Sequence, residues 1–232
     1  MNGHRQADHC TAPLRDAGFP YQMPRKQIGF YMTNLTKLRL FSLVTSSILA
    51  GSLCQAAFAT EIAGINFTDT LNLGGKDLQL NGAGVRSGLV NKMYVVGLYL
   101  QAKASTADEV LAAQGPRRIT LVMLDDISSE DLGDVFIKGL NNNMDQIDKQ
   151  KTIRNLIRFG EMFASVPGLR KGDKVDVDWS PETGMQCYVS SKKFGEAIPD
   201  LVLYNAILRI WVGANPSDPA LKSKLLAAAA QK

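Results

Sequence analysis

The alternation of apolar and polar residues after residue 60 predicts β-strands, because successive side chains of a strand point to opposite faces. Two of these runs flank Gly74-Gly75, a tight-turn signal that predicts a hairpin. Residues 181–184 are expected to close a second hairpin. Longer, continuously apolar runs indicate strands covered on both faces. The predicted strands lie at residues 65–67, 71–73, 78–80, 93–101, 117–124, 175–179 and 185–189.

Apolar residues spaced three and four apart predict helices between and after these strands. Ser128 or Ser129 is expected to cap the first helix, which presents an apolar stripe of Leu132, Val135, Phe136 and Leu140. The next helix is expected to turn to the core a stripe of Ile153, Leu156, Ile157 and Phe163. Residues 199–212 are apolar nearly all round and predict a buried helix, and residues 218–230 predict a short final helix.

Strands, helices, strands and helices therefore follow one another along the chain. This order predicts an α+β fold in which an antiparallel β-sheet carries a layer of helices on one face, as an open-faced sandwich. No repeat, linker or low-complexity segment interrupts residues 60–232, so we expect them to form one domain.

Residues 32–59 have the three parts of a secretory signal peptide. Lys37 and Arg39 precede an apolar stretch at 40–53, and Ala57-Phe58-Ala59 supplies a cleavage site. We therefore expect a secreted, periplasmic protein that is cleaved after about Ala59 and has no membrane span afterwards. A buried N-terminal helix is the alternative, whereas Leu53 before Cys54 argues against a lipoprotein. Residues 1–31 lack a periodic apolar pattern and are expected to be an over-called start, with translation beginning at Met32.

Removal of residues 1–59 changes the charge of the protein. The whole chain has 26 basic and 22 acidic residues, and 6 and 2 of these lie in the leader, so residues 60–232 have 26 − 6 = 20 basic and 22 − 2 = 20 acidic residues. A net charge near zero gives no electrostatic basis for binding nucleic acid or anionic membranes.

The remaining chain also contains no histidine, since His4 and His9 both lie in the leader. This excludes Ser-His and Cys-His nucleophile pairs and histidine-ligated zinc. The last cysteine, Cys187, lies in an alternating strand pattern and is expected to be a small buried hydrophobe. We predict no metal and no cofactor. Asp176 and Asp178 share one strand face, and we expect that face to be a solvated sheet edge rather than a cation site.

The segment 81–102, NGAGVRSGLVNKMYVVGLYLQA, contains the strongest candidate for a binding site. We expect a glycine-bracketed turn to deliver Arg86 to the start of an apolar strand that carries Tyr94. A guanidinium beside a phenol can hold the acidic end of an apolar molecule through charge-assisted hydrogen bonds. Tyr204 and Trp211, two turns apart on the predicted buried helix, could line one wall for the apolar part.

GAGVR followed by KMYVVGLYL, and AILRIWVGANPSDPALKSKLL near the end, resemble the chalcone isomerase-like family. The resemblance covers most of residues 62–226 and is closest to the exported bacterial branch of the family. It implies the α+β fold described above. Arg86 matches the active-site arginine of the plant chalcone isomerases, and Tyr94 stands at the position of their strand threonine.

The resemblance also implies that the isomerase chemistry is incomplete here. The catalytic tyrosine and asparagine of the plant enzymes lie on a helix that corresponds to residues 128–143, where Leu132 stands in the place of the tyrosine. The non-catalytic relatives bind fatty acids, with an arginine and a tyrosine at the positions that Arg86 and Tyr94 match. The resemblance therefore favours a non-catalytic protein that binds a fatty acid or another apolar, acid-headed small molecule.

Several alternatives stay open at this stage. The chain could be an isomerase or intramolecular lyase that uses Arg86 as an electrophile, so the sequence does not decide whether it is an enzyme. It could also be an interaction module with a vestigial cleft. Arg86 could instead pair with Asp77 or Glu196 and stabilise the hairpin. Tyr94 and Tyr99 are five apart on one strand and must face opposite sides, and Tyr204 and Trp211 could be core residues. The sequence gives neither the ligand nor the oligomeric state.

Overall fold

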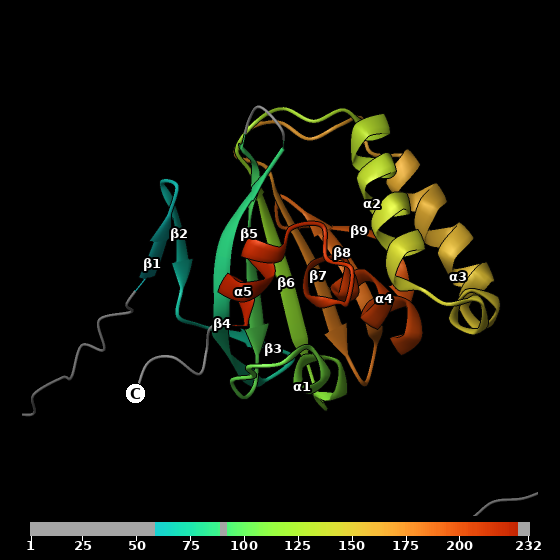
Figure 1. Ribbon diagram of the computed structural model, residues 1–232, viewed down its shortest axis with the longest axis horizontal. Helices are drawn as coiled ribbons and strands as arrows, with labels where there is room; N and C mark the ends of the chain where they lie inside the picture. Colours follow the sequence, from blue (N-terminus) through green and yellow to red (C-terminus); the bar gives the residue numbers. More distant parts are fainter. Residues whose placement is uncertain (1–58, 89–91, 227–232) are drawn as a thin grey trace, which may run out of the picture. The chain divides into compact units, whose positions relative to one another are not determined.

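In a computed structural model, which describes residues 59–88 and 92–226, seven antiparallel strands form the main sheet. Neighbouring strands in the sheet are also neighbours in the chain, so the sheet is a meander (Figure 1). The Gly74-Gly75 hairpin and the hairpin at residues 181–184 are both present, as predicted. The strands are β3 (Thr70–Leu73), β4 (Lys76–Ser87), β5 (Lys92–Leu100), β6 (Arg117–Met123), β7 (Lys174–Ser180), β8 (Gly184–Val189) and β9 (Lys192–Ile198).

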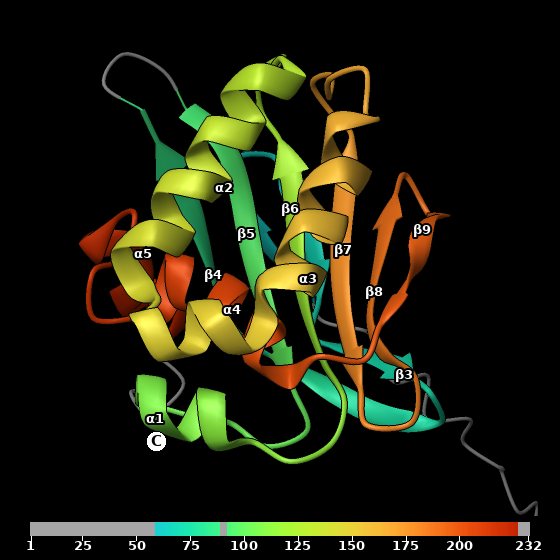
Figure 2. The same ribbon diagram turned by 90° about the vertical axis from the view of Figure 1, so that its right-hand side faces the viewer.

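Helices cover one face of this sheet, with α4 packed against it and α2 and α3 farther out (Figure 2). Side chains from the strands and helices share one apolar core, in which α4 is buried along most of its length. This arrangement confirms the predicted α+β open-faced sandwich. The helices are α1 (Ala107–Ala112), α2 (Ser129–Asn143), α3 (Gln146–Ala164), α4 (Leu201–Val212) and α5 (Pro219–Leu225).

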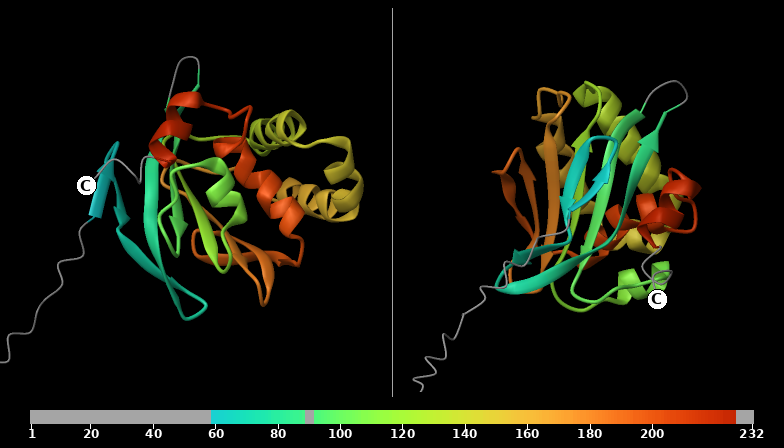
Figure 3. Two further views of the ribbon diagram at one scale, coloured as in Figure 1. Left: turned by 60° about the horizontal axis from the view of Figure 1, so that its bottom comes forward. Right: turned by 90° about the vertical axis from the view of Figure 1, so that its left-hand side faces the viewer.

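A small hairpin packs on the opposite face of the sheet (Figure 3). Its strands are β1 (Ala59–Ile62) and β2 (Ile65–Thr68), and Phe67 lies over Gly97 of β5, where a Cβ atom would approach the phenyl ring to 2.5 Å. Tyr99 points to this side and donates a hydrogen bond of 3.0 Å to the Thr68 carbonyl, whereas Tyr94 points to the helices. The prediction that these two tyrosines face opposite sides is confirmed.

Local capping explains where three of the helices begin. Ser128 precedes α2, and its hydroxyl accepts the Asp131 amide at 3.1 Å, as predicted. Asp200 caps α4, and Asp218 caps α5 directly before Pro219. Each cap satisfies backbone amides that have no partner within the helix.

The predicted core stripe of α3 is wrong at two positions. Ile153 and Ile157 are 49% and 55% exposed. Phe163 is buried as predicted, and the other buried residues of the helix are Thr152 and Phe159. The buried face of α3 is turned from the predicted one because the helix packs against α2, α4 and β9, and no other described element covers its outer side (Figure 2). Helix α1 and strand β9 were not predicted, since neither has a clear apolar period.

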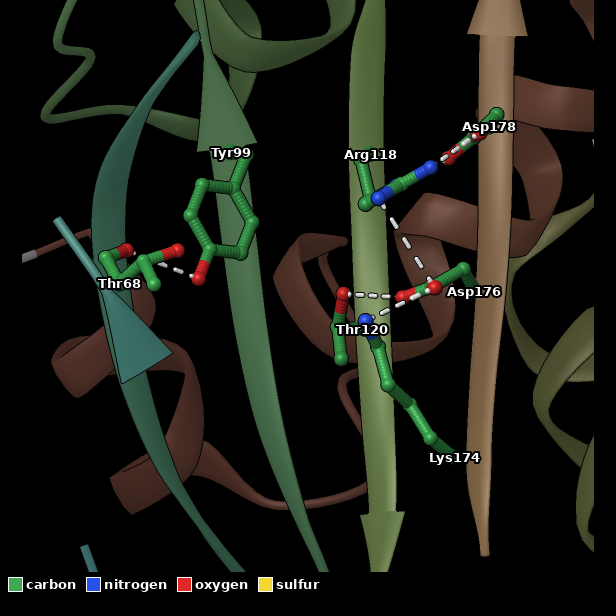
Figure 4. A network of polar contacts seen from close by, with 7 residues as sticks. All are labelled: Thr68, Tyr99, Arg118, Thr120, Lys174, Asp176 and Asp178. Carbon is green, nitrogen blue, oxygen red and sulfur yellow. Dashed lines mark hydrogen bonds and ion pairs between the residues drawn. The ribbon is translucent and has the colours of Figure 1, made fainter. Parts of the chain in front are cut away.

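The expectation of a solvated edge at Asp176 and Asp178 is also wrong. Strand β7 lies inside the sheet, and both carboxylates are buried on the face that carries the β1–β2 hairpin. Arg118 forms two hydrogen bonds with Asp178, one of them 2.6 Å long, and Thr120 donates one of 2.6 Å to Asp176 (Figure 4). Burial raises the pKa of the Asp178 carboxyl, and the hydrogen bonds from Arg118 oppose that shift.

Cys187 lies buried in β8, as predicted. Burial raises the pKa of its thiol to about 12, so the thiol stays protonated at neutral pH. The predicted signal peptide, with its cleavage site, and the predicted over-called start precede the described residues, except for Ala59 itself.

Candidate functional site

Arg86 is delivered to the helix-covered face by strand β4, and not by the predicted turn. Gly82 and Gly84 lie within β4, on the same face as Arg86, and α5 rests directly on them. A Cβ atom on Gly82 would lie 2.7 Å from the Leu225 carbonyl oxygen, and one on Gly84 would lie 2.9 Å from the Leu221 side chain. The glycines are therefore needed for close approach of α5, which brings its N-terminus beside Arg86.

Arg86 and Tyr94 lie directly opposite each other in the β4–β5 pair. Opposite residues of an antiparallel pair point to the same face, with their Cβ atoms about 4.5–5.5 Å apart. Tyr94 is 1% exposed, whereas the Arg86 side chain is 22% exposed. The pair therefore joins a buried phenol to a cation that reaches the edge of the helix layer.

Trp211 of α4 completes this group. Its indole Nε1 donates a hydrogen bond of 3.2 Å to the Tyr94 hydroxyl, and both side chains are buried. Burial raises the pKa of Tyr94, while the Trp211 hydrogen bond and the Arg86 charge lower it; the net shift is upward. Tyr94 is thus a neutral phenol at physiological pH, and its own proton can be donated to an acceptor.

The bonds that Arg86 makes do not use all of its donors. Its Nη1 donates to the Ser87 carbonyl and lies 3.9 Å from the Asp218 carboxylate, which is an ion pair longer than a hydrogen bond. Its Nε is buried without a hydrogen-bond partner. The proposed pairing with Asp77 or Glu196 is wrong, because Asp77 accepts from Asn72 and Glu196 pairs with Lys193.

Phe136 of α2 packs on the far side of Trp211, edge to face, with 6.0 Å between ring centroids. Sequence reasoning placed Phe136 in the core without relating it to the site. It also did not identify Asp218 as the partner of Arg86, although the Asp218-Pro219 pair is a typical helix start.

The structure places Tyr204 apart from the other three predicted site residues. Its ring lies between Trp179, at 5.6 Å, and the guanidinium of Arg117, at 5.1 Å. The Tyr204 hydroxyl is fully buried and has no hydrogen-bond partner, and burial raises its pKa.

Arg117 is a second cation under the helix layer, and it is 1% exposed. Its Nη1 donates to the Val110 carbonyl at 3.0 Å and to the Asn205 side chain at 3.2 Å, while its Nε has no partner. Burial lowers the pKa of Arg117, but a guanidinium remains charged at any physiological pH. In the sequence, Arg117 and Arg118 look alike, and only the pleat of β6 separates them onto opposite faces.

In the part of the chain that the structure describes, no group of three His, Cys, Asp or Glu side chains is placed to hold a metal ion. None of the described helices is both long and apolar enough to cross a membrane.

Fold and site together define an α+β open-faced sandwich protein with a cation and a phenol between its sheet and its helices. The family model for chalcone isomerase-like proteins matches residues 59–227, and the chain therefore belongs to the chalcone isomerase-like family. Among solved structures, a fatty-acid binding protein from Arabidopsis thaliana is similar, with a TM-score of 0.57 and 16% sequence identity over 70% of this chain and 92% of that chain. This likeness shows a shared fold. A search of curated proteins finds no match.

Proposed function

We propose that this protein is an exported, non-catalytic member of its family that binds a fatty acid or a similar apolar acid at Arg86 and Tyr94. One observation supports this most: Arg86 stands opposite a buried phenol and keeps a buried Nε–H without a partner. A buried donor without a partner is costly, and a ligand carboxylate would remove that cost.

The polar end of the proposed ligand would be held by charge-assisted hydrogen bonds. Arg86 can offer Nε and its terminal nitrogens, and Tyr94 can offer its O–H. Such bonds contribute roughly 1.5–3 kcal/mol each. The Asp218 carboxylate, 3.9 Å from Nη1, would compete with the ligand for Arg86, so binding is expected to weaken this ion pair.

The apolar tail would lie in the layer between the sheet and α4. Trp211 begins this path, and Tyr204 lies seven residues earlier on the same buried face, about 10 Å along the helix. Each buried methylene would contribute about 0.8 kcal/mol. Trp211 and Phe136 now pack against each other, so entry of a tail requires both rings to shift.

The isomerase alternative receives less support from the surroundings of Arg86. Ring closure needs polar groups that stabilise the developing negative charge. On α2, the position expected to carry such a group is Leu132, which is apolar and 3% exposed. The residue of α2 that packs against Trp211 is Phe136, which is also apolar.

The location belongs to this proposal as well. The signal-like segment at 32–59 supports export to the periplasm as a domain of residues 60–232, in agreement with the exported bacterial branch that the sequence resembles. Expression of the full-length sequence in a Gram-negative bacterium, followed by intact-mass measurement of the periplasmic fraction, tests cleavage after Ala59.

Binding can be tested by native mass spectrometry of protein purified without detergent, followed by fatty-acid titration monitored through the tryptophan fluorescence of Trp179 and Trp211. Arg86→Met keeps an unbranched side chain but removes the guanidinium and its charge, and Arg170→Met is a matched control because Arg170 is exposed on a loop. We expect Arg86→Met to weaken binding by roughly 10- to 150-fold, since 1.5–3 kcal/mol is lost, and Arg170→Met to have no effect.

Circular dichroism must show that Arg86→Met is folded before this comparison is made. A folded wild-type protein that carries no lipid and ignores added fatty acids would contradict the proposal. Equal affinity of wild type and folded Arg86→Met would contradict the role of Arg86.

A further inference from the structure

The outer side of α2 and α3 carries most of the large apolar side chains that the described part of the chain exposes. Ile137 and Ile147 are 60% and 61% exposed, and Ile153 and Ile157 are 49% and 55% exposed. The fifth such residue, Leu201, lies at the start of α4. Large apolar side chains exposed on a pair of helices are typical of an interaction surface.

A groove runs between the two helices, with a cavity volume of about 480 Å³. Its floor is apolar and consists of Phe136, Leu140, Leu156, Phe159 and Phe163, and Ile137 and Ile157 stand on its rims.

Two glycines keep this groove open. A Cβ atom on Gly133 or Gly160 would meet no atom within 4 Å. Gly139, also on α2, differs, because a Cβ there would lie 2.8 Å from Ile210 of α4. Packing within the chain therefore explains Gly139 but not the other two, although glycine inside a helix lowers its stability. The open space is suited to side chains from another molecule.

We propose that this face binds a second copy of the same chain and forms a two-fold symmetric dimer. The surface is self-complementary, since one face presents both protruding isoleucines and the groove that could receive them. A two-fold interface requires this property, because the same patch meets itself. The inference is independent of the proposed fatty-acid site.

The charges of the two helices favour one orientation of the dimer. Residues 129–143 contain three acidic and one basic residue, and residues 146–164 contain four basic and two acidic residues. A two-fold axis parallel to the helices would place α2 of one copy over α3 of its partner, and so acidic over basic. An axis perpendicular to the helices would place α2 over α2, and the acidic residues of the two copies would repel each other. The favoured dimer is therefore a four-helix layer of the kind found in helix bundles.

Two other occupants of this face are disfavoured, one by charge and one by the extent of the apolar surface. The two helices have no net positive charge, and Glu130 and Asp134 stand at the groove, so anionic lipid headgroups would not be attracted. A small molecule in the groove would leave Ile147 and Ile153 exposed, because neither lines the cavity.

Sedimentation equilibrium over a range of protein concentrations tests this proposal, with the protein expressed from its full-length sequence. We expect a dimer for wild type and, for Ile157→Lys, a dissociation constant raised at least about tenfold, equivalent to 1.4 kcal/mol. Leu201→Lys is the matched control, because it makes the same change at an exposed apolar residue outside this face, and we expect no effect.

A wild-type protein that is monomeric at every soluble concentration would overturn the inference. A dimer that Ile157→Lys leaves unchanged would overturn the assignment of this face. Binding of the monomer to phosphatidylglycerol vesicles, lost in Ile157→Lys, would assign the face to a membrane and also overturn the proposal. Circular dichroism distinguishes a broken interface from an unfolded variant.

Discussion

Removal of two tyrosine hydroxyls from the same buried layer should change stability in opposite directions. Tyr204 on α4 is 0% exposed and Tyr94 on β5 is 1% exposed, and both side chains lie in the core between the sheet and the helices. Their hydroxyls differ in one respect: that of Tyr94 accepts the indole N–H of Trp211 at 3.2 Å, and that of Tyr204 has no partner. The substitutions Tyr204→Phe and Tyr94→Phe isolate this difference.

The expected magnitudes follow from the cost of a buried polar group without a partner, about 1–3 kcal/mol. Tyr204→Phe removes such a group and keeps the ring contacts with Trp179 and Arg117, so the free energy of unfolding should rise by about 1 kcal/mol. Tyr94→Phe creates such a group at the Trp211 N–H, so the free energy of unfolding should fall by about 1–3 kcal/mol. The two variants should therefore differ by at least about 2 kcal/mol.

Equilibrium unfolding in urea, followed by circular dichroism, measures both values. All proteins should be compared at one concentration, because dimerisation would add to the apparent stability. A loss of stability in Tyr204→Phe equal to that in Tyr94→Phe would refute the reasoning. It would mean that the Tyr204 hydroxyl has a partner in solution, for which Arg117 Nε is a candidate because it also lacks one and its guanidinium lies over the Tyr204 ring.

Three other substitutions test the electrostatic and packing arguments. Burial raises the pKa of Asp200, but hydrogen bonds from Thr152, Asn155 and backbone amides outweigh this effect and hold the pKa below its ordinary value. The carboxylate therefore contributes to stability above the unfolded-state pKa. This contribution is lost as the pH falls through the lower folded-state pKa. Asp200→Asn should therefore flatten the dependence of unfolding free energy on pH in the acidic range, and an unchanged acid limb would contradict this. Gly82→Ala should destabilise by about 1–3 kcal/mol or more, because its Cβ would overlap the backbone of α5. Gly133→Ala, in open space on a helix, should stabilise the monomer by about 0.5–1 kcal/mol, and thermal melts of monomeric protein that rank the two glycines equally would contradict the packing argument.

Most strands and helices could be predicted from the sequence because their apolar periods are strong. The Gly74-Gly75 hairpin, the cap at Ser128 and the buried helix that ends at Val212 all lie where the local sequence pattern predicts them. Helix α3 shows the limit of this reasoning. Its isoleucines and phenylalanines form a stripe wider than the surface that α2, α4 and β9 can cover, and only packing decides that Phe159 is inside and Ile157 outside.

The sequence indicated three residues that the fold brings together, but not how the fold does so. Arg86, Tyr94 and Trp211 come together, since strand register and helix packing join them, but the role of Gly82 and Gly84 depends on α5, which follows more than 130 residues later. The partner of Arg86 likewise lies on α5. Contacts of this range leave no local pattern in a sequence, and the two nearer candidates for the partner acid were wrong for this reason.

Three arginines of the sheet differ in how far their charge is neutralised, and this difference is the physical reason for assigning the proposed ligand to one of them. Arg118 is bonded twice to the Asp178 carboxylate and lies near Asp176, so its charge is already neutralised and it stabilises the sheet (Figure 4). Arg117 is held by neutral acceptors such as the Val110 carbonyl and is sealed under α4.

Arg86 alone of these three combines partial exposure with a distant acidic partner and a free buried donor. An incoming carboxylate could reach it from the edge of the helix layer and would gain a bond that the folded chain leaves unmade. The same carboxylate at Arg118 would have to displace two close carboxylate contacts, and at Arg117 it would have to open the core. The unequal neutralisation of these cations, and not their number, therefore places the proposed acid-binding site at the end of β4.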